Sequence, residues 1–152
     1  MRTLALVALL LPQHGVLVPG RSLGGVRLGA TPAQVERAWG GFHGTCRNCA
    51  HRTWYFTYRR FDRVGAGVEF RNGRAAAIFT LWKPPGWRTS RGLTLGEPTA
   101  RMTALYGALP QTHCAGYDAF SLLGRRATTT FYVAGDTMWG FGLTRPQVPL
   151  CR

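Results

Sequence analysis

One segment of the sequence occurs twice, and this internal repeat limits the folds open to the chain. Residues 25–40 and 92–107 align without a gap at a constant separation of 67 positions. Such a repeat predicts one supersecondary unit used twice, with repeat 1 over 18–86 and repeat 2 over 87–152 packed together as one domain. The identical pairs in the alignment are Gly25/Gly92, Leu28/Leu95, Gly29/Gly96, Ala33/Ala100 and Gly40/Gly107.

Each copy of the repeat predicts a short strand, a glycine turn and a helix. In the first copy Thr31 is a suitable N-cap, Pro32 suits the first helical position, and Gln34 completes a capping box. Gly40 supplies the flexible residue at which a helix ends. The positions i, i+3 and i+4 then form one apolar face, which consists of Val35, Ala38 and Trp39.

The second copy predicts a helix that begins at Pro98 and ends at Gly107, with a buried face of Met102, Leu105 and Tyr106. Helices of about ten residues are not stable alone in water, so both must dock on other structure. We expect that structure to be a sheet. The predicted fold class is therefore α+β: two tandem repeats with short helices on one face of a mostly antiparallel sheet.

Strand signals follow each predicted helix. The segment 53–59 is rich in β-branched and aromatic residues, and Asn72-Gly73 is a favoured two-residue hairpin turn. The second copy predicts strands over 117–123, 128–133 and 137–144.

Simple alternation from the Asn72-Gly73 turn places Val68 opposite Ala77 and divides the hairpin into two faces. The predicted core face is Val68, Phe70, Ala75, Ala77, Phe79 and Leu81, and the opposite face is Glu69, Arg71, Arg74, Ala76, Ile78, Thr80 and Trp82. In the second copy, alternation puts Tyr132, Trp139, Phe141 and Leu143 on one face and Phe131, Val133 and Met138 on the other.

The N-terminus predicts export. Met1-Arg2-Thr3 precedes eight apolar residues, which is typical of a signal peptide and too short to span a bilayer. We assign 1–17 as a signal-peptide-like segment and expect a secreted or cell-envelope location; an N-terminal strand or a truncated gene start is the alternative. No later segment predicts a transmembrane span.

The chain carries 19 basic and six acidic side chains, for a net charge of +13. The arginines are scattered, and the great excess of Arg over Lys indicates a coding bias more than a nucleic-acid surface, so no nucleic-acid partner is expected. Such a charge favours anionic partners, namely phospholipid, acidic wall polymer or an acidic protein.

Four cysteines behind a signal-like start indicate two disulfides, and three pairings exist. We favour Cys46–Cys49 as a local brace and Cys114–Cys151 as a tie between the loop after the second helix and the C-terminal tail. The cluster His43, Cys46, Cys49 and His51 also allows a zinc site or a redox pair. Haem attachment would need Cys-x-x-Cys-His, whereas Ala50 intervenes here.

The sequence offers few residues that are suited to catalysis. The six acidic residues form no close pair on the predicted elements, and no serine has a Gly-x-Ser-x-Gly setting. We therefore predict a protein that is not an enzyme and that uses no metal and no cofactor.

The repeated pattern of strand, Leu-Gly, helix, aromatic-Gly and hairpins resembles the beta-lactamase-inhibitory-protein fold, and each half is similar to small outer-membrane assembly lipoproteins. The segments that carry the resemblance are 26–29 with Val35, Trp39 and Gly40, and 93–96 with Met102, Tyr106 and Gly107. The resemblance implies a secreted or envelope location, disulfides after each helix, and cofactor-free protein binding through one sheet face. It does not imply inhibition of a beta-lactamase, because fold does not fix function.

The leading functional prediction is an exported protein-binding module, inhibition being one form of such binding, that uses an exposed aromatic and arginine-bearing sheet face. Aromatic and arginine side chains are the usual anchors of an interface. An envelope module that binds anionic polymer or lipid is the alternative, followed by a thiol-redox or zinc protein. The predicted face consists of Tyr55, Arg59, Arg71, Ile78, Trp82, Phe131 and Met138.

Overall fold

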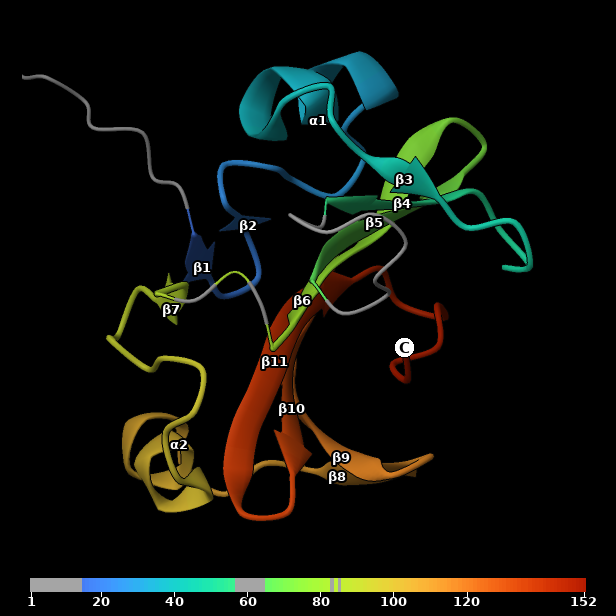
Figure 1. Cartoon of the computed structure of the whole chain (residues 1–152). Helices are drawn as coiled ribbons and strands as arrows, with labels where there is room; N and C mark the ends of the chain where they lie inside the picture. Colours follow the sequence, from blue (N-terminus) through green and yellow to red (C-terminus); the bar gives the residue numbers. More distant parts are fainter. Residues whose placement is uncertain (1–14, 57–64, 83, 85) are drawn as a thin grey trace, which may run out of the picture.

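The computed structural model describes residues 15–56, 65–82, 84 and 86–152, and it has an α+β fold with two short helices and mostly antiparallel sheets (Figure 1). A three-stranded sheet has the order β2-β1-β7 and an eight-stranded sheet the order β3-β4-β5-β6-β11-β10-β9-β8. No helix within the described residues has the length and apolar character needed to cross a membrane. The strands are β1 (Val16–Val18), β2 (Ser22–Leu23), β3 (Gly44–Thr45), β4 (Thr53–Phe56), β5 (Ala66–Arg71), β6 (Arg74–Leu81), β7 (Arg88–Thr89), β8 (Gln111–Cys114), β9 (Tyr117–Leu123), β10 (Thr128–Ala134) and β11 (Thr137–Thr144).

Local sequence signals fix the ends of both helices as predicted. Helix α1 (Pro32–Trp39) begins with a capping box, in which the Thr31 amide donates to Gln34 Oε1 at 2.8 Å and the Gln34 amide donates to Thr31 Oγ1 at 3.3 Å. Helix α2 (Thr99–Tyr106) follows Pro98, which makes no side-chain cap. Gly40 and Gly107 end the two helices at positive φ, 91° and 78°.

Both helices contribute to one hydrophobic core, as the apolar spacing predicted. Val35 of α1 and Met102 of α2 are buried in the same cluster, and Trp39, Leu105 and Tyr106 pack against it half-buried. Figure 1 shows α1 near the part of the eight-stranded sheet that carries β3 to β5, and α2 beside β11. The short helices are therefore held by tertiary packing.

The eight-stranded sheet consists of two four-stranded groups, β3 to β6 and β8 to β11, which meet at one antiparallel pair. Strands β6 and β11 are joined over five residue pairs, from Leu81↔Gly140 to Ala77↔Thr144. In each group the chain order runs from the edge of the sheet toward this junction.

The first hairpin contains a β-bulge that corrects the predicted faces. The Asn72-Gly73 turn pairs Arg71 with Arg74 and Phe70 with Ala75, but Glu69 then pairs with Ala77 and leaves Ala76 without a partner. The extra residue shifts the alternation, so that Val68 lies opposite Ile78 instead of Ala77. Ile78 therefore lies in the same cluster as Val35 and Met102, called the helix-side core here, whereas Phe79 and Leu81 lie in a separate cluster. The prediction that placed Phe79 and Leu81 on the core face, with Ile78 on the opposite face, is wrong.

The second hairpin has the same irregularity at Trp139. Tyr132 pairs with Gly140 and Val133 with Met138, so Trp139 is the extra residue. Phe141 consequently pairs with Phe131 in the helix-side core, and Leu143 joins the same cluster. The prediction that placed Phe141 and Leu143 on the face opposite Phe131 is wrong for the same reason.

The end of the predicted leader, residues 1–17, overlaps the first strand of the structure. Val16 and Leu17 belong to β1, and Leu17 is fully buried in the helix-side core. The assignment of 1–17 as a signal-peptide-like segment stays a prediction. The predicted apolar stretch 4–11 lies outside the described residues.

Glycines at the centre of the sheet allow a close approach that side chains would prevent. A Cβ atom at Gly140 would lie 2.1 Å from the Thr80 carbonyl oxygen, and one at Gly142 would lie 2.6 Å from the Ile78 carbonyl oxygen. On β5, a Cβ at Gly67 would lie 2.5 Å from the Phe79 ring. These three positions require glycine because a side chain would not fit there. Their backbone angles are ones that any residue can adopt.

We expect Gly140→Ala to lower the free energy of unfolding by about 3 kcal/mol, because the added methyl group meets rigid backbone in β6. Urea unfolding of the purified full chain measures this change. Gly41→Ala is the matched control: its Cβ would meet open space, so its effect should stay within about 0.5 kcal/mol. Equal effects of the two substitutions would contradict the close-packing argument.

Candidate functional site

The face of the eight-stranded sheet that points away from the helices is covered in part by the chain itself. This face, called the tail face here, is formed by the buried side chains Phe79, Leu81, Ala119 and Tyr132. Residues 145–152, called the strap, cross it: Val148 packs on Ala76 and Ala77, and Leu150 packs on the tail face. Figure 1 shows this C-terminal segment on the side of β10 and β11 away from α2. The prediction of a free second face is therefore wrong over this region.

Two tyrosines hold the main chain of the strap. The Tyr132 hydroxyl donates to the Leu150 carbonyl oxygen at 2.9 Å, and the Tyr117 hydroxyl donates to the Arg152 carbonyl oxygen at 2.6 Å. The Tyr132 side chain is fully buried, and this burial raises its pKa from 10.0 to about 12, although the neighbouring Arg152 opposes the shift.

A buried carboxylate holds the end of the strap. Arg152 Nη1 donates to Glu69 Oε2 at 2.6 Å, and the two side chains are only 6% and 12% exposed. The second carboxylate oxygen of Glu69 accepts from Arg71 Nε at 2.7 Å. The Arg152 guanidinium also lies 5.5 Å from the centre of the Phe79 ring. Glu69 is thus shared by two arginines, one from β5 and one from the strap.

Both predicted disulfides are confirmed. Cys46 is bonded to Cys49 and Cys114 to Cys151, which leaves no free cysteine. The second bond joins the edge strand β8 to the strap and fixes the strap covalently. Disulfides of this kind are typical of proteins outside the cytosol.

The cysteine–histidine cluster does not form the geometry of a zinc site. The Cys46 and Cys49 sulfur atoms are bonded to each other and cannot serve as thiolate ligands. The His43 ring stacks on Trp54 at 3.8 Å between centres, and its Nε2 lies 3.1 Å from Glu36 Oε1. Within the described parts of the chain, no three histidine, cysteine or acidic side chains converge on a point that could hold a metal ion.

A second imidazole–carboxylate pair lies at the sheet edge, where His113 Nδ1 is 2.6 Å from Asp118 Oδ1. Such a pair orients an imidazole for catalysis when a nucleophile stands on its other side. Cys114, the adjacent residue, is consumed in a disulfide. Among the residues that the structure describes, no hydroxyl or thiol group is hydrogen-bonded to either His43 or His113.

The seven residues predicted as a binding face are not brought together. Ile78, Phe131 and Met138 are fully buried in the helix-side core, so their assignment to an exposed face is wrong. The bulges at Ala76 and Trp139 shift the alternation of side chains on β6 and β11. As a result, Phe131 faces Phe141 across the second hairpin. Arg59 lies outside the described residues. The remaining three are Tyr55, half-buried with its ring edge-on to Phe79, Arg71, half-buried on Glu69, and Trp82, which is 50% exposed.

Trp82 is joined through its main chain to a pair of packed aromatic residues, and the three residues are called the aromatic rim here. Its members are Trp82, Trp139 and Tyr117. The Trp82 amide donates to the Trp139 carbonyl oxygen, and the Trp139 and Tyr117 rings lie 5.0 Å apart. Trp82 has φ of +65°, a left-handed conformation that costs a residue with a side chain about 1–2 kcal/mol.

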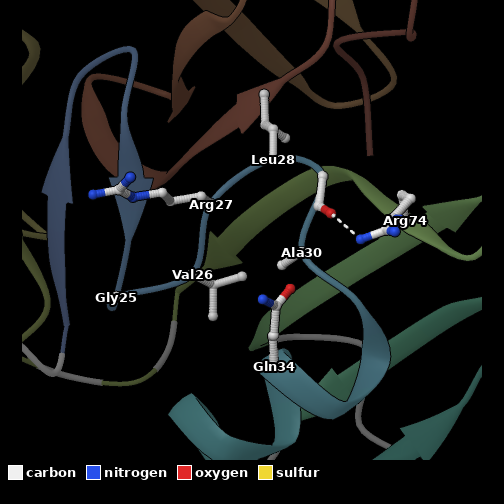
Figure 2. Close-up of a pocket in the computed structure, with 8 residues that line it drawn as sticks. Gly25, Val26, Arg27, Leu28, Ala30, Gln34 and Arg74 are labelled. Atoms are coloured by element: carbon white, nitrogen blue, oxygen red, sulfur yellow. Dashed lines mark hydrogen bonds between the residues drawn. The ribbon is translucent and has the colours of Figure 1, made fainter.

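A shallow hollow of about 470 Å³ lies beside the start of α1 (Figure 2). Its polar side chains are Arg27, Gln34 and Arg74; Arg74 Nη1 donates to the Gly29 carbonyl oxygen at 3.4 Å. The lining offers no carboxylate, imidazole, thiol or hydroxyl group, so it cannot supply a general base or a nucleophile. Its positive charge suits an anionic group, although Figure 2 shows that the Arg74 side chain reaches toward the Gly29 carbonyl oxygen whereas the Arg27 side chain extends away from it.

Comparison with protein-family models, with curated proteins and with solved structures finds no match for this chain. The site therefore has to be judged on its own geometry. Sequence reasoning overlooked the role of Tyr117, Tyr132 and Arg152 in holding the strap. The predicted Cys114–Cys151 bond was the available signal, since it requires the tail to return to the sheet edge.

Ionisation of Tyr132 should destabilise the fold in alkaline solution. Its raised pKa means that the unfolded chain loses the Tyr132 proton near pH 10, whereas the folded chain keeps it until about pH 12. The corresponding stability is complete below pH 10 and is lost as the pH rises to 12, by roughly 3 kcal/mol. Tyr132→Phe should remove this slope, and urea unfolding of both proteins at pH 9 to 12 measures the difference. Parallel pH profiles would contradict the assignment.

Proposed function

We propose that this chain is an exported, non-enzymatic protein-binding module that contacts its partner through the aromatic rim. The two disulfides favour an extracytoplasmic location. The net charge of +13 favours a partner with an acidic surface, because opposite potentials steer association.

The proposal includes the duplication inferred from the sequence and the resemblance to the beta-lactamase-inhibitory-protein fold. Hairpin register supports it: Val68↔Ile78 and Phe131↔Phe141 stand in corresponding places, each the fourth pair from the turn and each beyond a single-residue bulge. The strand order also supports it, since each proposed copy supplies four strands in the same succession from edge to centre.

Trp82 is the observation that carries the proposed binding role. Tryptophan is the residue type most enriched at the energetic centre of protein interfaces. This one is half exposed and is held at positive φ by the hydrogen bond to Trp139. A costly backbone conformation that presents a large apolar side chain to solvent is typical of functional sites.

Binding to an anionic envelope component is the second candidate, and the hollow favours it. Arg27 and Arg74 line the hollow, and neither has a carboxylate partner among the residues that the structure describes. This function would depend on charge alone and would disappear at high salt. Binding of the full chain to vesicles of anionic phospholipid, measured at low and high salt, tests it directly.

Trp82→Gly tests the protein-binding role. The full chain, immobilised, is used to capture its partner from the envelope and culture fluid of the producing organism, and the dissociation constant is then measured with the purified partner. We expect Trp82→Gly to weaken this binding by about 30-fold or more, as for an interface hot spot. Its free energy of unfolding should change by less than about 1 kcal/mol, because glycine tolerates positive φ.

Phe42→Ala is the matched control, since Phe42 is an aromatic residue that is 81% exposed outside the rim. It should leave the dissociation constant unchanged. An unchanged affinity of the Trp82→Gly protein, or a large loss of stability, would overturn the proposed role of the rim.

A further inference from the structure

We propose that the tail face is a peptide-binding groove, selective for an extended segment with a leucine and an arginine two residues later, and that the strap fills this groove in cis. Leu150 and Arg152 are the leucine and arginine of the strap. Tyr117 and Trp139 of the aromatic rim also pack against the tail face, but the proposal does not depend on the function assigned to the rim.

The contacts to the main chain of the strap do not depend on its sequence. The hydroxyls of Tyr132 and Tyr117 donate to the carbonyl oxygens of Leu150 and Arg152. Every residue in an extended segment has such a carbonyl oxygen, so the two tyrosines can position any chain of this shape. Their spacing corresponds to carbonyl groups two residues apart, which point the same way in an extended segment.

Selectivity comes from two side-chain subsites. Leu150 packs against the apolar cluster that contains Ala119 and Tyr132. The guanidinium of Arg152 lies 2.6 Å from Glu69 Oε2 and 5.5 Å from the centre of the Phe79 ring. A buried carboxylate beside an aromatic ring is a specific receptor for a planar cation, because the carboxylate would be left poorly paired without it.

The strap satisfies the groove incompletely. The hydroxyl oxygens of Ser121 and Thr144 and the Nε atom of Arg152 are buried without a hydrogen-bond partner. By strand alternation, Ser121 lies on the same face as Ala119, and Thr144 on the same face as Gly142. A segment that paired these groups would bind better than the strap does. The strap also forms no strand, so its displacement breaks no β-ladder.

The Cys114–Cys151 bond keeps the strap in place, and Cys114 can report on a competing peptide once Cys151 is removed. The test uses the full chain with Cys151→Ser and Arg152→Ala. The probe is a synthetic peptide with the sequence of residues 145–152, whose cysteine is a mixed disulfide with glutathione. The Cys114 thiolate attacks the peptide sulfur, a protein–peptide disulfide forms, and glutathione leaves as the thiolate, so one disulfide replaces another without net oxidation.

We expect mass spectrometry to show capture of this peptide at least about tenfold faster than capture of a peptide with citrulline at the last position, which is isosteric but uncharged. Glu69→Gln should remove the difference between the two peptides. Trp82→Gly should leave it unchanged, which separates this result from the function of the rim. Equal capture rates for the two peptides would overturn the proposal and leave the strap as a covalent brace only.

A second measurement serves if the double variant does not fold. In the chain with both disulfides intact, Glu69→Gln should accelerate amide hydrogen exchange in residues 150–152 by about tenfold or more, because the guanidinium subsite is lost. Unchanged exchange there would contradict a selective arginine site.

Discussion

The close approach of β6 to β11 is the constraint on which the rest of the structure depends. Within the described residues, the two four-stranded groups form one continuous sheet through this strand pair, and Gly140 and Gly142 leave the space in which the β6 backbone lies. Phe79 pairs across the sheet with Gly67 on one side and Gly142 on the other, so its ring covers positions that have no side chain of their own. The same ring forms part of the surface under Arg152. The glycines that allow the junction therefore also build the floor beneath the strap.

The two bulges determine what each face of the sheet contains. Without the extra residue Ala76, alternation from the turn would direct Phe79 toward the helices and Ile78 toward the strap. With it, an aromatic ring lies on the same face as Glu69, the carboxylate shared by Arg71 and Arg152. A single unpaired residue in β6 thus converts an apolar sheet face into one that can bury a charge pair.

Interactions within a few residues of each other made much of this fold predictable. The Thr31 and Gln34 capping box, the glycine stops at Gly40 and Gly107 and the Asn72-Gly73 turn are local, and the structure has all of them. The bulges have no comparable signature, because Ala76 and Trp139 share no residue type or flanking motif. Because the prediction missed one extra residue in each hairpin, it assigned every residue beyond the bulge to the wrong face of the sheet. The strap was also missed, since its contacts join residues that are up to 83 positions apart.

The bond between Cys114 and Cys151 gives the second half of the molecule a closed covalent ring that contains β9, β10 and β11. A protease that cuts one of the turns between these strands would open the ring without dividing the molecule. The two pieces would stay attached and in register, because the sheet holds them side by side. A single cut within this ring would therefore leave both the junction with β6 and the covering of the sheet in place.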